Sequence, residues 1–195
     1  SVETQTKKHS TDQSSSESSD SQSQQQEATQ VAAQDMAEIV QELNANSASE
    51  LQEVNIEKGK NEFTLDIPST IIFKEGEYEL TNPAAKNFVA KIARVIRTMP
   101  QTFNIEIIGH TDRNQLGNSE IPRDGWDISA LRSIAVVKKN IKNRIDPAVL
   151  KVSAYSSFHP KSELAADNRR VEMRFFAQEA QDNILSEENF FDRLE

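Results

Sequence analysis

The sequence predicts a two-layer α/β sandwich of the α+β type, in which two helices cover one face of a small mixed β-sheet. The chain has 195 residues, of which 36% are hydrophobic, so it can form one domain with a single core and still leave residues outside it. Its apolar patterns follow the order β-α-β-α-β with a final strand. Alternating elements of this size each need an apolar partner face, and packing both helices on one side of the sheet meets that need.

Three segments lie outside the predicted domain. Residues 1–30 contain nine serines and seven glutamines, which predicts a disordered tether, because this composition buries too little apolar surface to offset the entropy of ordering. Residues 177–195 form an acidic tail whose apolar residues are available to dock on the domain or on a partner. Residues 31–53 predict a linker of one or two short amphipathic helices, which either packs on the edge of the domain or couples it to another part. The apolar stripe of this linker is Val31, Met36, Ile39, Val40, Leu43 and Leu51.

The predicted domain spans residues 54–176 and opens with a strand and a helix. Residues 63–67 alternate apolar and polar side chains, which predicts a half-buried strand. Asn82 and Pro83 then begin a helix in the favoured capping order, and Pro100 ends it. One face of this helix stays apolar throughout, so we expect it to face the core.

The second half of the domain repeats this order. A strand is predicted over residues 103–108, and two more over residues 150–155 and 168–176. The helix between the first two of these strands is capped by Asp124 or Asp127. We expect its inward face to consist of five apolar residues: Ile128, Leu131, Ile134, Val137 and Ile141.

Charge and composition argue against several classes of function. The formal net charge is −9, from 31 acidic and 22 basic residues, which disfavours a nucleic-acid-binding surface. No window of 18 or more apolar residues predicts a membrane span, although a chain that begins at Ser1 leaves room for an anchor or export signal upstream. There is no cysteine, and none of the three histidines are at i, i+4 spacing, so we predict no metal and no cofactor.

The sequence also predicts no catalysis. Ser129 lies within a predicted helix and lacks the Gly-x-Ser-x-Gly elbow that a serine hydrolase needs. No pair among the many acidic residues is singled out for glycoside cleavage, and there is no glycine-rich phosphate loop.

Polar residues of interest lie where the strand over residues 103–108 ends and the next helix begins. Asp112 follows that strand, while Ser129 and Arg132 share one helix face at i, i+3 spacing. If the two elements meet, the carboxylate can bind an ammonium and the guanidinium a carboxylate, which forms a clamp for a zwitterion. The alternative is that Asp112 and Arg132 simply pair with each other as a salt bridge. For His110, packing in or under the loop is favoured over a ligand role.

Three motifs together resemble the OmpA-like peptidoglycan-binding domain, and the likeness covers about residues 54–176. The motifs are Ile-Ile-Gly-His-Thr-Asp at 107–112, Trp-Asp-Ile-Ser-Ala-Leu-Arg at 126–132 and Asn-Arg-Arg-Val-Glu at 168–172. The resemblance implies that Asp112 and Arg132 hold a diaminopimelate-type stem peptide. It also implies supporting roles at the peptidoglycan site for Thr111, Ser129, Asn168, Arg169 and Arg170. Either of the two adjacent arginines could instead have a structural role.

Within this family the run from Trp126 to Ser129 and the polar tether are more similar to the MotB group of flagellar stator proteins than to lipoproteins such as Pal. That likeness implies a periplasmic, homodimeric anchor that binds the stem peptide and glycan strand of peptidoglycan. It also implies a MotA-like channel subunit, joined through a missing N-terminal transmembrane helix in the inner membrane. Two alternatives stay open: an envelope protein of the Pal/OmpA type and, less favoured, an enzyme acting on the cell wall.

Three positions depart from the family pattern. Ser133 replaces the alanine that usually follows the arginine of the helix motif. Ala154 and Ser156 stand on either side of a tyrosine, where glycine is common in the family. We expect these changes to affect the loop after the tyrosine more than the clamp.

Overall fold

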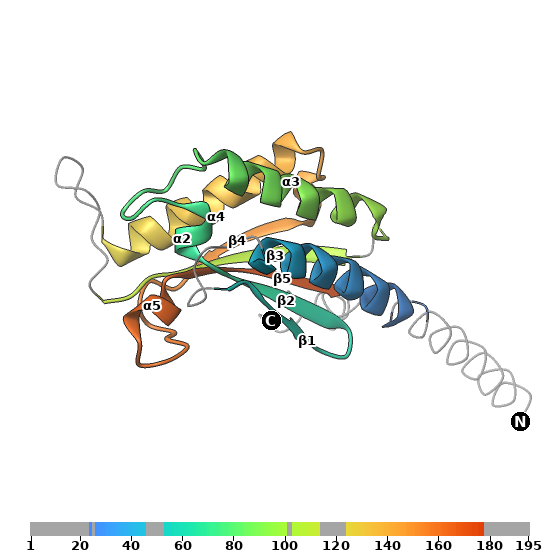
Figure 1. The fold of residues 1–195 in the computed structure, drawn as a ribbon, viewed down its shortest axis with the longest axis horizontal. Helices are drawn as coiled ribbons and strands as arrows, with labels where there is room; N and C mark the ends of the chain where they lie inside the picture. Colours follow the sequence, from blue (N-terminus) through green and yellow to red (C-terminus); the bar gives the residue numbers. More distant parts are fainter. Residues whose placement is uncertain (1–23, 25, 46–52, 101–102, 114–123, 178–195) are drawn as a thin grey trace, which may run out of the picture.

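The computed structural model describes residues 24, 26–45, 53–100, 103–113 and 124–177 (Figure 1). The predicted tether up to residue 23, Leu51 of the linker and the tail beyond Ala177 lie outside these described residues. After the first helix the elements are β1 (Asn55–Lys58), β2 (Glu62–Pro68), α2 (Ser69–Ile72), α3 (Pro83–Thr98), β3 (Phe103–His110), α4 (Gly125–Lys142), the 3-10 turn η1 (Pro147–Val149), β4 (Leu150–Ala154), α5 (Ala165–Asn168) and β5 (Arg170–Ala177).

Five strands form one mixed sheet in the order β1-β2-β5-β3-β4. β3 and β4 run parallel, and the other neighbouring strands run antiparallel. Alternate residues of the three central strands point into one core, as the period of two in a strand requires. These core residues are Phe63, Leu65, Ile67, Ile105, Ile107, Val171, Met173 and Phe175. The predicted α+β class with a small mixed sheet is confirmed.

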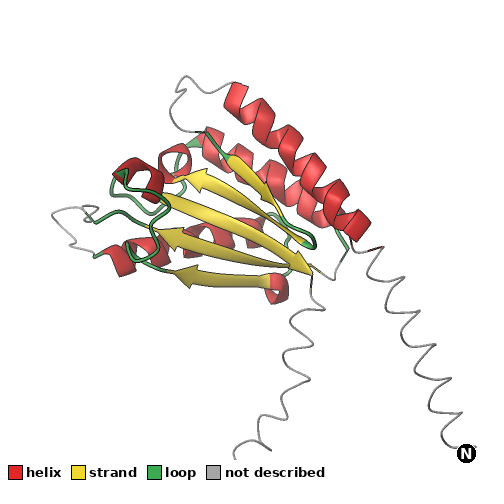
Figure 2. Cartoon of the chain, turned by 90° about the horizontal axis from the view of Figure 1, so that it is seen from below, coloured by secondary structure: helices red, strands yellow, loops and turns green. Residues whose placement is uncertain are grey.

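The long helices cover one face of this sheet. Figure 1 shows α3 and α4 side by side above the strands, and Figure 2, seen from below, shows the strands in front of them. α3 begins as predicted, because Asn82 Oδ1 accepts a hydrogen bond from Ala84 N at 2.9 Å and Pro83 occupies the first turn. Its apolar face, which includes Phe88 and Ile92, is buried in the core.

The predicted inward face of α4 is correct only in part. Ile128 is buried and Val137 packs against the core, whereas Leu131 and Ile134 are half-buried. Asp124 caps the helix and Asp127 returns the bond in a capping box, but Ile141 is 41% exposed. The prediction also missed the small residues of α4 that pack at Gly109 of β3, where an added Cβ would overlap the carbonyl oxygen of Ser129. Because α4 lies this close to the strand, mainly small or polar side chains face the sheet there. The buried residues of α4 are Ile128, Ser129, Arg132, Ser133, Val136 and Asn140.

The helix over residues 26–45 extends beyond the predicted linker, because residues 26–30 of the predicted tether are helical. Val31, expected to face inward, is 60% exposed. Asn44 exchanges two 3.0 Å hydrogen bonds with the backbone of Val54, so the helix packs on the domain. None of the described helices is long and apolar enough to cross a bilayer. The buried stripe of the helix over residues 26–45 consists mostly of small side chains: Thr29, Ala32, Ala33, Met36 and Val40.

Met36 is the largest side chain that this helix buries, at 0% exposure. Met36→Ala is therefore expected to lower the free energy of unfolding by about 2 to 4 kcal/mol, because it leaves a cavity in the core. Val31→Ala, on the exposed side of the same helix, is the control and is expected to cost less than about 0.5 kcal/mol. Urea unfolding of both variants measures the difference. Equal values would show that the helix is not packed as described.

Four short elements were not predicted from the sequence. β1 lies at the edge of the sheet and three of its four residues are exposed, so it lacks the alternation that reveals a strand. α2, η1 and α5 have only three or four residues each, which is too short for a helical period to show. Because α5 ends at Asn168, the last strand begins at Arg170 and not at residue 168 as predicted.

Candidate functional site

The predicted site residues gather at one end of the sheet. β3 ends there at His110, α4 begins there with its capping box, and α5 lies just before β5 (left-hand end in Figure 1). The parallel β3–β4 pair brings the turn after β4 to the same end, where Thr111 N donates to Ser156 O at 2.8 Å. Three segments that are distant in sequence therefore meet around Thr111 and Asp112.

A cleft of about 390 Å³ opens at this meeting point. Three of the predicted site residues, Thr111, Asp112 and Asn168, line it directly. The other walls come from the turn before α5 and from the residue after Asp112; they are Arg113, Ser157, Pro160, Ser162, Glu163 and Ala165. The lining includes acidic side chains, Asp112 and Glu163, and a basic one, Arg113, which suits a ligand that carries both a positive and a negative charge.

Asp112 forms an ion pair with Arg169, through a contact between Oδ2 and Nη1. The carboxylate is almost fully buried, with 3% of its side chain exposed, whereas 31% of the Arg169 side chain is exposed. The sequence raised the possibility that Asp112 pairs with Arg132. In the structure Arg169 is a direct partner of Asp112, and Arg132 interacts with both through its charge.

Arg132 is held in the interior, with 1% of the residue exposed. Its Nε donates to the carbonyl oxygen of Glu77 at 2.8 Å, and its guanidinium lies 5.2 Å from the centre of the Phe73 ring. The pKa of Arg132 is lowered to about 10, mainly by burial and secondly by the charge of Arg169, while the charge of Asp112 raises it. Its Nη1 is buried and makes no hydrogen bond within the described part of the chain. Arg132 therefore remains a cation at neutral pH and keeps one unused donor.

Ser129 and Thr111 build the frame of the cleft. Ser129 is 0% exposed, and its Oγ donates to Trp126 O at 3.2 Å and accepts from Ser156 N at 3.2 Å. Ser156 has a φ of 52°, in the left-handed region that glycine adopts most readily. Gly125 is needed beside it, because an added Cβ would overlap the Ser156 side chain. Ser129 thus joins the start of α4 to the turn that follows β4.

Asn168 shapes the cleft wall. Its Oδ1 accepts hydrogen bonds from the backbone N–H groups of Lys161 and Ser162, at 2.7 and 3.2 Å, and its Nδ2 donates to Ser162 O at 2.8 Å. These three bonds close the turn between Lys161 and α5. Because the Asn168 amide makes these hydrogen bonds within the turn, its contribution is to hold the wall of the cleft in place.

Arg170 points away from the cleft, into an ion-pair network. Its Nη2 lies 2.9 Å from Glu172 Oε1, and its Nε lies 3.5 Å from Asp66 Oδ1. His110 Nε2 lies 3.2 Å from Glu172 Oε1, and 5% of the His110 side chain is exposed. The His110 ring stacks on that of Tyr155. The His110 hydrogen bond, followed by the charges of His110 and Arg170, holds the pKa of Glu172 below its ordinary value despite burial. The geometry thus separates the two arginines: Arg169 contacts Asp112, which lines the cleft, whereas Arg170 contacts Glu172 and Asp66.

This separation predicts different results for two neighbouring substitutions. Arg169→Gln is expected to weaken ligand binding at the cleft about threefold to tenfold, with little loss of stability, because its side chain is partly exposed. Arg170→Gln is expected to lower the free energy of unfolding by about 2 to 4 kcal/mol, because it removes a buried cation that Glu172 and Asp66 share. Each carboxylate then keeps one partner, His110 for Glu172 and Lys161 for Asp66. Arg174→Gln, on the same strand with a 40% exposed side chain, serves as a control that costs at most about 1 kcal/mol. Urea unfolding and sedimentation with purified cell-wall sacculi measure the two effects, and a reversed order would contradict the assignment.

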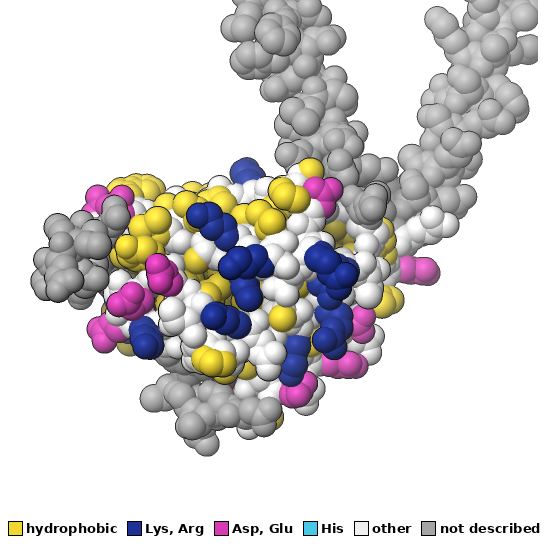
Figure 3. Space-filling model, turned by 90° about the horizontal axis from the view of Figure 1, so that it is seen from above, with side chains coloured by type: hydrophobic (Ala, Val, Ile, Leu, Met, Phe, Trp, Pro, Cys, Tyr) yellow, Lys and Arg dark blue, Asp and Glu magenta, His cyan; other side chains and the backbone are white. Residues whose placement is uncertain are grey.

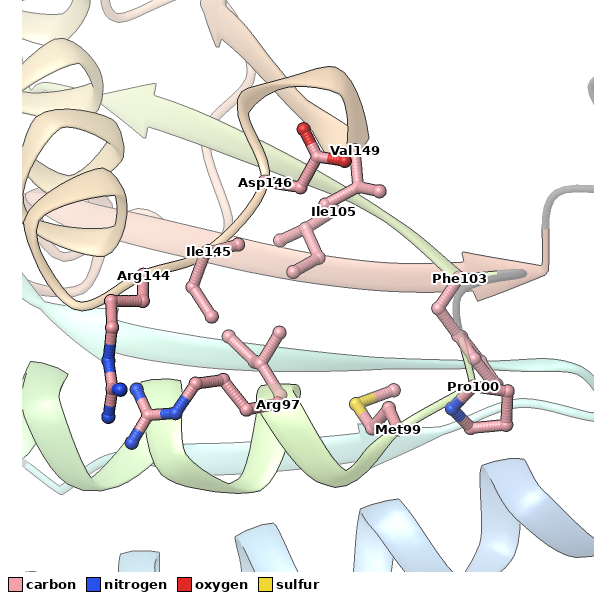
Figure 4. A pocket seen from close by; sticks show the side chains of 10 residues that line it. Arg97, Met99, Pro100, Phe103, Ile105, Arg144, Ile145, Asp146 and Val149 are labelled. Atoms are coloured by element: carbon pink, nitrogen blue, oxygen red, sulfur yellow. The ribbon is translucent and has the colours of Figure 1, made fainter.

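Two other hollows lie away from these residues. An apolar pocket of about 300 Å³ lies at the opposite end of the sheet, between the end of α3 and η1, with Arg97 and Arg144 at its rim (Figure 4). A groove of about 480 Å³ runs between α3 and α4, where lysine and arginine side chains gather on the helical face (Figure 3). Neither contains a predicted site residue. We therefore place the candidate site at the cleft beside Asp112.

Several residues of this site have no signal in the sequence. Phe73 and Glu77, which hold Arg132, lie more than 50 positions before it, and neither belongs to a motif. Ser157 and Glu163 line the cleft because the turn around Pro160 brings them there. Only the cluster of small and polar residues in this turn could have indicated it.

The arrangement offers recognition chemistry. A buried carboxylate, a partly exposed guanidinium and a buried guanidinium with one unused donor lie together, with a net charge of +1. Among the described residues, no group of three or more histidine, aspartate or glutamate side chains could hold a metal ion. Ser129 is fully buried and bonded to backbone on both sides, so it is not exposed as a nucleophile would need to be.

Comparison with protein families and curated proteins gives consistent similarities. A family model described as the OmpA family matches residues 72–174. Motility protein B from two strains of Helicobacter pylori is similar: one is 29% identical over 134 residues, the other 28% identical over 123. The matches cover 64% and 60% of this chain, and 51% and 47% of the relatives. The chain thus spans about half the length of the curated relatives it matches.

Solved structures show the same fold. A putative MotB-like protein from Desulfovibrio vulgaris is 27% identical, with a TM-score of 0.61, over 78% of this chain and 95% of that one. The periplasmic domain of Helicobacter pylori MotB is 24% identical, with a TM-score of 0.59, over 68% and 85% of the two chains. The cell wall anchor of the T6SS from Pseudomonas aeruginosa, 20% identical, also has a TM-score of 0.61, over 73% and 96%. The last two likenesses concern the fold alone.

Proposed function

The chain belongs to the OmpA family, and on that basis we propose that its domain binds peptidoglycan without catalysing a reaction and anchors a MotB-type flagellar stator to the cell wall. The observation that carries the proposal is the charge arrangement at the cleft: Asp112, Arg132 and Arg169 together. The free end of a diaminopimelate side chain carries an ammonium and a carboxylate on one carbon. A site with one carboxylate and two guanidiniums complements both groups.

Binding in this proposal is an exchange of partners. In the ligand-free domain Arg169 neutralises Asp112. The ligand's ammonium takes the place of the Arg169 guanidinium on Asp112, and Arg169 turns to the ligand's carboxylate. The unused Nη1 of Arg132 is the second donor for that carboxylate. Because Arg132 is buried, its charge is weakly screened and acts strongly on an anion nearby.

The stator part of the proposal draws on the similarity to motility protein B and to MotB periplasmic domains. A stator anchor of this kind works in the periplasm as a homodimer. Its full-length form is a single-pass inner-membrane protein that joins a MotA-like channel subunit. The helix over residues 26–45, which packs on the domain, determines the distance between the membrane and the peptidoglycan-binding domain in this proposal.

Sedimentation with purified sacculi tests peptidoglycan binding directly. The chain is expected to pellet with sacculi and to release no muropeptides into the supernatant, as measured by chromatography. A chain that stays in solution would refute the binding, and reproducible muropeptide release would show an enzyme. For the stator role, deleting the gene is expected to stop swimming while flagella still form; normal swimming would rule that role out.

A further inference from the structure

Two exposed aromatic side chains stack on each other beside the cleft. Trp126 is 50% exposed and Phe158 is 67% exposed, yet their ring centres are 5.4 Å apart and their planes differ by 24°. The exposure of such large apolar groups to water is unfavourable in free energy, so a pair of them on an acidic, polar surface indicates a site that a ligand or partner covers. They account for two of the six large hydrophobic residues that are exposed in the described part of the chain.

The aromatic pair, Trp126 and Phe158, is held in place by buried contacts. Trp126 stands in the first turn of α4, and its carbonyl oxygen accepts the Ser129 hydroxyl at 3.2 Å. Phe158 belongs to the turn after β4, whose Ser156 N–H donates to the same hydroxyl at 3.2 Å. Phe158 N also donates to Tyr155 O at 3.1 Å. One fully buried serine thus fixes both backbones, so the rings are ordered before any ligand arrives.

The pair borders the proposed stem-peptide site. Ser157, next to Phe158 in the chain, lines the cleft with Asp112. Adjacent Cα atoms are about 3.8 Å apart, and three extended residues of a peptide span about 10 Å. A stem peptide whose third residue lies at Asp112 therefore places the sugar that carries it within reach of the aromatic pair.

We propose that the aromatic pair binds a sugar ring of the glycan strand, through stacking between the apolar C–H face of the pyranose and the aromatic faces. This inference rests on the proposed function and assigns its second subsite. Pyranose C–H groups carry partial positive charge and match the negative face of an aromatic ring. Asp124 and Asp127, in the same turn of α4 as Trp126, disfavour an anionic ligand here and suit a neutral N-acetylated sugar.

Trp126 is the only tryptophan in the chain, so its fluorescence reports on this subsite alone. The test titrates the full chain with two probes: the tripeptide Ala-Glu-diaminopimelate and the same tripeptide attached to its disaccharide. The disaccharide-tripeptide is expected to bind about threefold to tenfold more tightly and to shift Trp126 emission. The tripeptide alone is expected to bind with little change in emission.

Substitutions then separate the sugar from the peptide. Phe158→Ala and Trp126→Ala, followed by calorimetry, are expected to bring the affinity for the disaccharide-tripeptide down to that for the tripeptide, which itself stays unchanged. Leu164→Ala is the matched control, because Leu164 is also 67% exposed but is not one of the residues that line the cleft. This variant is expected to keep the full advantage of the sugar.

The possible failures are distinguishable. If the tripeptide binds but the disaccharide adds nothing, or if its advantage survives Phe158→Ala, the sugar subsite is wrong and the proposed function stands. If neither probe binds, both proposals fall. If the two aromatic variants leave ligand affinity unchanged but convert a dimer to a monomer in light scattering, the pair is a contact between two copies of the chain, and the sugar proposal is overturned.

Discussion

Replacing Arg132 with methionine is expected to reduce binding to sacculi about 30-fold or more while leaving the domain at least as stable as before. The loss of binding follows from removing a buried cation that faces the ligand's carboxylate. The stability follows from the cost of burying that cation. Burial, together with the charge of Arg169, lowers the pKa of Arg132 to about 10, a shift that corresponds to roughly 3 kcal/mol. The side chain is charged in both folded and unfolded states at neutral pH, so this cost applies fully there and declines only above about pH 10.

Methionine restores similar volume beside Phe73 without the charge, although it gives up the bond to Glu77 O. We therefore expect the free energy of unfolding to be unchanged or to rise by up to about 2 kcal/mol. Urea unfolding and sedimentation with sacculi measure the two effects on one protein sample. Arg94→Met, an exposed arginine on α3, is the control that should alter neither. A stable Arg132→Met domain that still pelleted with sacculi would exclude Arg132 from the site.

Replacing Asp112 with asparagine is expected to reduce binding about as strongly, but with the opposite effect on stability. Asp112 offsets two guanidiniums, those of Arg169 and Arg132. Without its charge the two cations repel each other with no counter-charge between them, and the free energy of unfolding should fall by roughly 1 to 3 kcal/mol. Calorimetry with a diaminopimelate tripeptide and urea unfolding measure the two changes.

The double variant Asp112→Asn with Arg169→Gln separates these two roles. Removing Arg169 as well relieves the repulsion, so most of the lost stability should return. Binding should not return, because the ligand's ammonium still has no carboxylate partner. Recovery of binding in the double variant, or no loss of stability in the single one, would contradict the arrangement described for the cleft.

Local patterns in the sequence were enough to predict the main elements of the fold. The capping pair Asn82–Pro83 and the apolar face of α3 identify that helix without any tertiary information. Short alternating runs identify β2 and β5, although β5 begins at Arg170 because Asn168 closes the turn before it. These features work because they depend on neighbours only two to four residues away.

Features that depend on distant contacts could not be predicted in this way. The close approach of α4 to Gly109 buries the small residues Ser129 and Ser133, which the apolar period of the helix does not indicate. The helix over residues 26–45 begins within a segment whose composition suggests disorder, because Thr29 and Met36 find a core to pack on. Periodicity in a single segment does not record which surface that segment will meet.

The candidate site shows the same division. The sequence made the clamp conditional on the strand end at Asp112 meeting the start of the next helix. In the structure both are joined to the turn after β4, through Thr111 N to Ser156 O and Ser156 N to Ser129 Oγ. The motifs did not predict that Arg169 pairs with Asp112, nor that Arg132 is buried beneath the site on Phe73. Only the three-dimensional contacts separate Arg169 from its neighbour Arg170, since the two are identical in type and adjacent in sequence.

The central claim is that the cleft recognises the zwitterionic end of a stem peptide through Asp112 and Arg132, and comparison of two tripeptides tests it most directly. One ends in diaminopimelate and the other in lysine, which has the ammonium but lacks the adjacent carboxylate. Calorimetry is expected to give a Kd for the lysine peptide about 30-fold or more above that for the diaminopimelate peptide, and Arg132→Met should abolish the difference. Equal affinity for the two peptides in the unaltered chain would contradict the claim.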